Sequence, residues 1–298
     1  MSAIASAVDP RLKSVLVATD FSETSQKPLR HALAIARHYG AKLYLAHVVS
    51  SLGFTLAGAD ALNAATEAAK RDAHHLETRL VESGALAGLQ HEFIIGQGTV
   101  WEVLNQVIRQ EQVDLIVNGT HGRRGLRKVV LGSVAEQIFR YADCMVFTVG
   151  PGSYQESRVD DLLPNRTFLF LTDFTEASLH ALPYAISYAN QFGAKLVLLH
   201  VLPTAPKPKS LLYTAALQGL KEVTRNSTLK VKPEFVVEFC PAGPISEKIL
   251  ETSENLNVDL IIMGLRRSKY VEATSHAPWA TAYEVVCGAG CPVVTARR

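Results

Sequence analysis

The sequence has few cysteines, little net charge and no long apolar run, and each shortage argues against a class of protein. Four cysteines in 298 residues do not make a disulfide framework. A net charge of +2 gives no basic footprint, so we expect no nucleic-acid partner. No uncharged run approaches the roughly 18 residues of a membrane span, so we expect no membrane partner. The N-terminus lacks a basic segment followed by an apolar stretch, which argues against a signal peptide and favours a cytoplasmic location.

The common catalytic motifs are missing as well. There is no Walker sequence, no G-x-S-x-G, no H-E-x-x-H, and no evident carboxylate pair or general base. In "CGAGC" (287–291) three residues separate the two thiols and no second ligand pair lies nearby, which favours packing cysteines over a zinc site. These absences favour a binding protein over an enzyme.

The chain contains an internal repeat of three blocks in the same order. The blocks, each followed by its copy, are "SVLVATDFSETS" (14–25) and "TFLFLTDFTEAS" (167–178), "HYGAKLYLAHVV" (38–49) and "QFGAKLVLLHVL" (191–202), and "VDLIVNGTHGRRG" (113–125) and "VDLIIMGLRRSKY" (258–270). The third pair is offset by fewer residues than the first two, so the second half is shorter in its middle. This pattern indicates a tandem duplication. We expect domains at 1–150 and 166–298, joined by a Gly-, Pro-, Ser- and Asp-rich linker at about 151–165.

Each half alternates short apolar runs, typical of buried strands, with segments of helical periodicity. The strands expected in the first half are 14–19, 42–49, 90–96, 114–119 and 144–150. The helices expected between them are 25–41, with Gly40 as its stop, about 60–83, 100–112 and 133–142. Apolar strands separated by helices predict a parallel sheet covered on both faces. The predicted fold class is therefore α/β: two doubly wound, five-stranded parallel-sheet domains (Rossmann-like) in tandem.

The stretch "GTHGRRGLRKVVLGSV" (119–134) follows the fourth strand and holds spaced glycines. Gly119 and Gly122 open the loop, and Gly132 and Ser133 precede the next helix. Glycines let a backbone approach an oxygen closely, and a helix N-terminus attracts phosphate. The alternative is an ordinary turn whose serine caps the helix.

Other strand ends fall at the same edge of the predicted sheet. Asp20 follows the first strand and Val48 ends the second, and ligands of open parallel sheets bind beyond these carboxyl ends. An aspartate in this place also serves as a helix cap. The basic run after Gly122 is typical of a solvated face, and His47 and His200 are interpreted as structural.

These residues resemble the universal stress protein family. Gly119-x2-Gly122-x9-Gly132-Ser133 is similar to the family's nucleotide-binding signature, as are "VATDFSETS" and "AHVV", and the resemblance covers nearly the whole chain. It implies that the first domain binds ATP, with Mg²⁺ accompanying the nucleotide. The residues that the resemblance places around ATP are Asp20 at the nucleoside with Ala18 and Thr19 beside it, Val48 on the adenine, the main chain near Asn118, and Gly119, His121, Gly122, Gly132, Ser133 and Val134 at the phosphates and ribose.

ATP binding without a hydrolytic apparatus indicates a nucleotide-dependent sensor or switch in a stress response, read by protein partners that the sequence does not identify. Three alternatives stay open: a nucleotide-free interaction scaffold, a slow ATP hydrolase, and an enzyme that adenylates a substrate. The last needs a glycine-containing loop after the first strand, which "ATDFSETS" lacks.

The second half has lost most of the glycine pattern. Gly264 remains, Arg267 stands at the position of Gly122, and the helix start equivalent to Gly132–Ser133 reads Ala280–Thr281. Pro278 removes an N–H close to that helix start. We therefore expect one ATP per chain, although Asp173 repeats Asp20.

Each half also ends in an apolar strand, "CMVFTVG" and "CPVVTAR", that leaves a sheet edge unless it is paired. Pairing of the two edges predicts an intrachain pseudo-dimer, and further homodimerisation of whole chains is left open.

Overall fold

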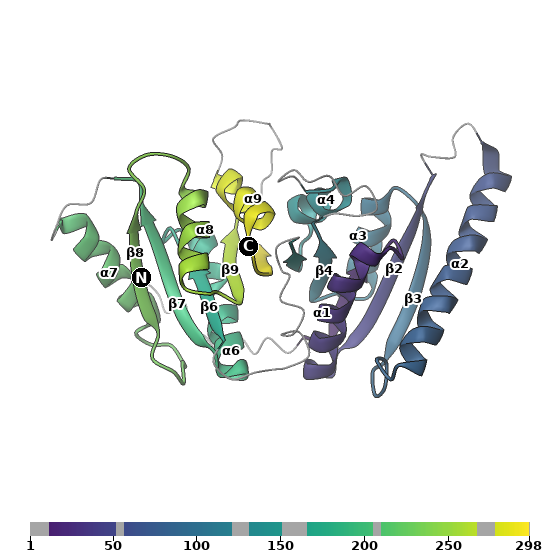
Figure 1. Cartoon of the computed structure of the whole chain (residues 1–298), viewed down its shortest axis with the longest axis horizontal. Coiled ribbons are helices and arrows are strands. Elements are labelled where there is room, and N and C mark those ends of the chain that lie inside the picture. The colour runs from purple at the N-terminus through teal and green to yellow at the C-terminus, as the bar shows by residue number, and fades with distance from the viewer. Residues whose placement is uncertain are drawn as a thin grey trace. The chain divides into compact units, whose positions relative to one another are not determined.

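The computed structural model describes residues 12–51, 57–120, 131–150, 166–204, 210–266 and 278–297 (Figure 1). The chain divides into two compact units, Arg11–Val149 and a unit that contains Gly150–Arg298. Each unit contains one copy of the sequence repeat. His121 and Gly122 of the expected site, and the expected linker, lie outside the described residues.

The elements of the first unit agree with the sequence prediction to within two residues at each end. The strands are β1 (Ser14–Ala18), β2 (Lys42–Ser50), β3 (His91–Gly98), β4 (Leu115–Gly119) and β5 (Met145–Val149). The helices are α1 (Glu23–Tyr39), α2 (Gly58–Glu82), α3 (Val100–Gln110) and α4 (Ser133–Tyr141).

The five strands of this unit are parallel and run in the order β3-β2-β1-β4-β5. The chain moves outward from β1 through β2 to β3, then returns to the other side of β1 for β4 and β5. The strand order therefore reverses between β1 and β4, which pair from Val15 with Leu115 to Val17 with Val117. Such a reversal opens a crevice at the carboxyl ends of the two strands.

Helices cover both faces of this sheet. On one face Leu16, Ile116 and Val146 pack with Leu104 of α3 and Ile138 of α4. Successive strand residues point to opposite faces. On the other face the ring centroid of Phe147 lies 5.3 Å from that of His31 in α1. Figure 1 shows α2 along the edge strand β3. The predicted doubly wound α/β fold is confirmed.

Gly40 ends α1 as predicted. It has φ 63°, in the left-handed region that glycine adopts without a steric penalty, and its N–H faces the last carbonyls of the helix. Gly193 ends the corresponding helix of the second unit in the same way, with φ 59°.

Each strand of the first unit has a counterpart in the second unit. Its strands are β6 (Thr167–Leu171), β7 (Lys195–Leu202), β8 (Glu234–Phe239), β9 (Leu260–Leu265) and β10 (Val293–Arg297). Its helices are α5 (Glu176–His180), α6 (Leu182–Phe192), α7 (Leu211–Thr224), α8 (Ile245–Asn255) and α9 (Pro278–Gly288). The order β10-β9-β6-β7-β8 is again wholly parallel.

The two units differ in their helices. Helix α2 has 25 residues and α7 has 14, which confirms the predicted shortening of the second half. The single helix α1 is replaced by α5 and α6, which meet next to Pro183. Helix α1 continues through Pro28, so a proline alone does not account for the break. Within the described ranges, no helix has both the length and the hydropathy of a membrane span.

Candidate functional site

The two ends of the loop that follows β4 are joined by a hydrogen bond. The Gly132 N–H donates to the Thr120 carbonyl at 2.7 Å, and the Thr120 N–H donates to the Val149 carbonyl at 3.1 Å. The start of α4 therefore lies beside the carboxyl end of β4, directly after Gly119. This is the edge of the strand reversal, where doubly wound proteins bind ligands.

Gly132, not Ser133, is the N-cap residue of α4. It has an extended conformation, φ −60° and ψ 155°, and no side chain caps the helix. Its carbonyl accepts the first intrahelical hydrogen bond, from the Glu136 N–H at 2.8 Å. Ser133 is the first helical residue and is exposed. The main-chain N–H groups of the first turn precede that bond and have no intrahelical acceptor, which makes the helix start suitable for an anion.

Asp20 forms a turn rather than a helix cap. Its Oδ1 accepts hydrogen bonds from the Ser22 N–H at 3.0 Å and from the Ser22 hydroxyl at 2.5 Å. Ser22 is the N-cap residue of α1. The carboxylate therefore stands between the end of β1 and the start of α1 and orders the connection between them.

The residues on both sides of Asp20 are also fixed. Thr19 is buried, its N–H donates to the Ala46 carbonyl at 2.9 Å, and its Oγ1 accepts the Phe21 N–H at 3.0 Å. Phe21 has φ 61°, in the left-handed region, which costs a bulky residue about 1–2 kcal/mol. Such strain persists only where the surroundings hold the residue in place.

His47 provides some of the contacts that keep Phe21 in this conformation. Its Nδ1 lies 2.8 Å from the Thr19 carbonyl oxygen, and because a carbonyl only accepts, Nδ1 carries the proton. The His47 ring centroid lies 4.6 Å from that of Phe21. The contact between His47 and Phe21 joins residues that are far apart in the sequence. A signal for this contact was present, because Thr-Asp-Phe and a histidine near the end of the next strand recur in both halves.

Three other expected site residues share one apolar surface. Ala18, Val48 and Val134 come from β1, β2 and α4, and all three are partly buried against the core cluster that includes Leu16 and Ile138. We refer to these three partly exposed residues, which come from the ends of β1 and β2 and the start of α4, as the apolar floor.

Asn118 is buried beside this floor, and its side chain is engaged locally. Its Oδ1 accepts from the Thr148 hydroxyl at 3.3 Å, and its Nδ2 donates to the Gly119 carbonyl at 3.3 Å. The Asn118 side chain is therefore engaged within the protein, and the expected contact of a ligand with the main chain near Asn118 stays a prediction. All the described site residues lie at one edge of the sheet, whereas His121 and Gly122 are not placed.

The second unit reproduces the Asp20 turn almost atom for atom. The Asp173 Oδ1 accepts from the Thr175 N–H at 2.9 Å and from its hydroxyl at 2.6 Å. Partial burial alone would raise the pKa of Asp173, but hydrogen bonds from the Thr175 and Ser178 side chains and from the Thr175 backbone outweigh it and lower that pKa. Phe174 again has a positive φ, 63°.

The apolar floor is not reproduced. Leu171 stands in the place of Ala18 and Met263 in that of Asn118, and both are buried. Val201, the equivalent of Val48, is also buried. Larger side chains thus close the surface that is partly exposed in the first unit.

Gly264 survives for a reason that involves no ligand. An ideal Cβ at this position would overlap the Ala177 carbonyl oxygen and lie 2.8 Å from that of Ser178. The first turn of α5 thus packs on β9 so closely that only glycine fits.

The start of α9 corrects one correspondence drawn from the sequence. Met263 pairs with Thr295 as Asn118 pairs with Thr148, and counting back from these pairs makes Trp279 and Ala280 the equivalents of Gly132 and Ser133. The alignment from sequence alone places them one residue later, because the segment before the helix is longer in the second unit and fixes no register. Helix α9 begins at Pro278, which lacks the N–H that a phosphate would use.

This register also explains an unpartnered hydroxyl. Thr295 is 1% exposed, and its Oγ1 has no hydrogen-bond partner among the described residues, because Met263 replaces the asparagine that Thr148 contacts.

Thr295→Val is expected to stabilise the second unit by about 1 kcal/mol. Thr148→Val is expected to destabilise the first unit by about 1 kcal/mol, since it leaves the Asn118 Oδ1 without this donor. Hydrogen-exchange mass spectrometry at increasing urea concentration measures each unit separately. Equal effects of the two substitutions would contradict this explanation.

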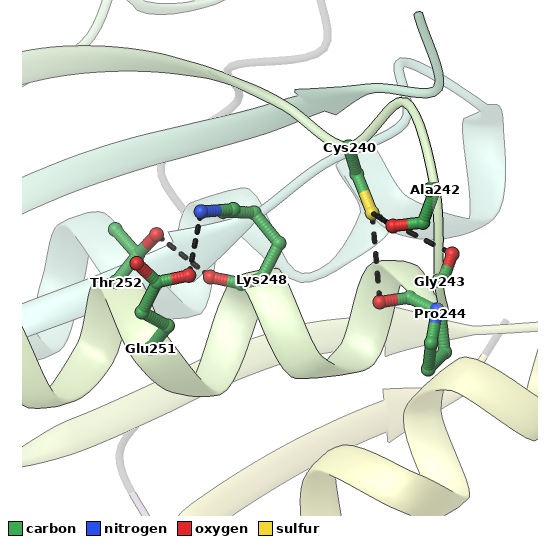
Figure 2. A network of polar contacts seen from close by, with 7 residues as sticks. All are labelled: Cys240, Ala242, Gly243, Pro244, Lys248, Glu251 and Thr252. Carbon is green, nitrogen blue, oxygen red and sulfur yellow. Dashed lines mark hydrogen bonds and ion pairs between the residues drawn. The ribbon is translucent and has the colours of Figure 1, made fainter.

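In the connection between β8 and α8, the Cys240 thiol contacts three backbone carbonyls (Figure 2). The Cys240 sulfur lies 3.4 Å from the Ala242 carbonyl oxygen and 3.6 Å from those of Gly243 and Pro244. The thiol is a weak donor, and these contacts connect it to three carbonyls of the turn.

Other thiols are also suited to packing. Burial raises the pKa of Cys144 and of Cys291 to about 12, which keeps both protonated near neutral pH. Among the described residues there is no cluster of three or more His, Cys, Asp or Glu side chains that would hold a metal.

These features place the chain in the doubly wound α/β class, and residues at the carboxyl edge of the sheet that are partly exposed in the first unit have buried equivalents in the second. The family model of the universal stress protein family matches residues 11–150 and again 164–297. The chain therefore belongs to the universal stress protein family, in which it is a tandem member.

Individual relatives match at low identity. Universal stress protein MJ0531 of Methanocaldococcus jannaschii is 28% identical over 138 residues, which cover 46% of this chain and 81% of that protein. Universal stress protein MJ0577 of the same organism is also 28% identical, over 156 residues that cover 46% of this chain and 94% of that protein. A crystal structure of a universal stress protein from Archaeoglobus fulgidus has a TM-score of 0.70 at 20% identity and covers 96% of this chain and 98% of that one. This likeness shows that the fold extends over both halves.

Proposed function

We propose that the first domain, residues 1–150, binds ATP and that the chain acts as a nucleotide-dependent sensor or switch. The observation that carries this proposal is the hydrogen bond from the Gly132 N–H to the Thr120 carbonyl at 2.7 Å. It sets the uncapped start of α4 against the end of β4, on the strand next to the one that Asp20 follows.

The chemistry of this edge suits the parts of a nucleoside triphosphate. The partly exposed floor of Ala18, Val48 and Val134 offers an apolar support for a planar base. Asp20 offers a carboxylate to a ribose hydroxyl, and the start of α4 offers main-chain N–H groups and the exposed Ser133 hydroxyl to phosphate.

Magnesium fits this site only as a companion of the phosphates. The described residues include no acidic cluster that would hold it alone, and Mg²⁺ is commonly bound through substrate phosphates and water. When bound, Mg²⁺ would neutralise phosphate charge, while the chain itself orients the base, the ribose and the phosphate tail.

Native mass spectrometry of the full chain with ATP and Mg²⁺ tests the proposal. We expect a complex with one ATP, because the second domain lacks both the open floor and the glycine loop. The double variant Gly122→Val/Gly132→Val is expected to bind no detectable ATP, because a Cβ at these positions keeps the backbone from approaching a phosphate closely, and to keep the wild-type circular dichroism. Unchanged ATP affinity in this variant would refute the proposal. Absence of ATP from the wild type would favour the nucleotide-free scaffold.

A further inference from the structure

Asp20 is held on both sides by contacts that lead back to one side chain, His47. Before Asp20, the His47 Nδ1–H donates to the Thr19 carbonyl at 2.8 Å, which fixes the peptide group that joins Thr19 to Asp20. After Asp20, the Phe21 ring packs on the His47 imidazole with 4.6 Å between centroids. The Phe21 N–H donates to the Thr19 Oγ1 at 3.0 Å, and this hydrogen bond joins the two ends of the three-residue turn.

The strained backbone of Phe21 shows why such contacts are needed. A phenylalanine with φ 61° returns to the extended or helical region unless its ring is held. Release of Phe21 would swing the neighbouring Asp20 carboxylate, because the two residues share a peptide plane. His47 thus restrains Phe21 and, through it, the direction of the Asp20 carboxylate.

The second domain contains the same arrangement without the open ligand edge. The His200 Nδ1 lies 2.8 Å from the Thr172 carbonyl oxygen, and the Phe174 and His200 ring centroids are 4.6 Å apart. The Phe174 N–H donates to the Thr172 Oγ1 at 2.9 Å. The second copy therefore provides an internal control for whatever these contacts contribute to folding alone.

We propose that His47, together with the Phe21 ring, is a positioning residue that fixes the direction of the Asp20 carboxylate and thereby sets the affinity of the first domain for a nucleotide. Part of this inference, the effect on affinity, rests on the proposed ATP function. The other part, the effect on the Asp20 turn, does not depend on any ligand.

The first measurement concerns the turn itself. The Ser22 amide donates to the Asp20 Oδ1 at 3.0 Å, so its hydrogen exchange reports whether the turn is formed. His47→Ala is expected to accelerate exchange of the Ser22 amide about tenfold, and His47→Asn, whose amide N–H can replace Nδ1–H, is expected to restore part of the protection. His200→Ala is expected to do the same at the Thr175 amide. Unchanged exchange at Ser22 in His47→Ala would overturn the proposal, whether or not ATP binds.

The second measurement is the dissociation constant of ATP, at a temperature where every variant is folded. His47→Ala is expected to weaken binding about five- to tenfold, with partial rescue by His47→Asn, as the loss of one ordering hydrogen bond implies. Phe21→Gly removes the ring but permits the positive φ, so it separates the ring contact from backbone strain and is expected to weaken binding as well. His200→Ala is expected to leave the constant unchanged.

The outcomes separate this inference from the proposed function. If the wild type binds ATP and His47→Ala binds it equally well, the positioning role is wrong and the proposed function stands. If the wild type binds no ATP, the proposed function is wrong, and the part of the inference that concerns affinity falls with it.

Discussion

Gly264→Ala is expected to unfold the second domain under conditions in which the wild type is fully folded. The added methyl group would overlap the Ala177 carbonyl oxygen and lie 2.8 Å from that of Ser178, and both belong to helix backbone that cannot move without its neighbours. Insertion of a carbon into such a contact costs about 3 kcal/mol or more. Urea denaturation followed by hydrogen-exchange mass spectrometry measures the loss in the second domain alone.

Gly290→Ala is the matched control for this substitution. Gly290 has no positive φ, and nothing lies within 4 Å of an ideal Cβ at this position, so the same chemical change is expected to alter stability by less than about 0.5 kcal/mol. If Gly264→Ala is tolerated as well as Gly290→Ala, the close packing of α5 on β9 is wrong.

This prediction also bears on Gly119, the first-domain equivalent of Gly264. By the repeat, Thr24 and Ser25 of α1 correspond to Ala177 and Ser178. A packing requirement at Gly119 would make its substitution a poor test of ligand binding, because stability would fall first. A test of ligand binding therefore uses Gly122 and Gly132 and does not substitute Gly119.

Asp20→Ala is expected to weaken ATP binding by about 10- to 100-fold, while Asp173→Ala leaves it unchanged. A hydrogen bond to a charged group contributes about 1.5–3 kcal/mol, which corresponds to this range. Each substitution removes the same turn contact, from the Ser22 N–H at 3.0 Å in one domain and from the Thr175 N–H at 2.9 Å in the other. The turn contact that is lost is therefore similar in the two domains, and a difference in ATP binding reports the contact with the ligand. Equal loss of binding in both variants would contradict the assignment of the site to the first domain.

Much of the fold could be predicted because the sequence signals it locally. Apolar runs such as 14–19 and 42–49 became β1 and β2, and the helix stop at Gly40 has the expected positive φ. The internal repeat then extended the prediction to the second half, where the strand order is the same. The pairing of the two terminal strands and the domain boundaries remain predictions.

The site was predicted less completely, since its details depend on contacts between distant residues. Phenylalanine disfavours a positive φ, so the sequence around Phe21 does not indicate one, and the contact of its ring with His47 comes from another strand. Gly264 was interpreted as a remnant of a phosphate loop, but it packs against Ala177, which lies far away in the sequence. Ser133 was a candidate cap, yet the cap is Gly132, because the Thr120 carbonyl binds the Gly132 N–H and so sets where α4 begins.

Isothermal titration calorimetry of the full chain with ATP and Mg²⁺ tests the central claim most directly. The account predicts a stoichiometry near one ATP per chain, with binding about 10- to 100-fold weaker in Asp20→Ala and unchanged in Asp173→Ala. Two equivalent sites per chain, or a single site that Asp173→Ala removes and Asp20→Ala leaves intact, would contradict it.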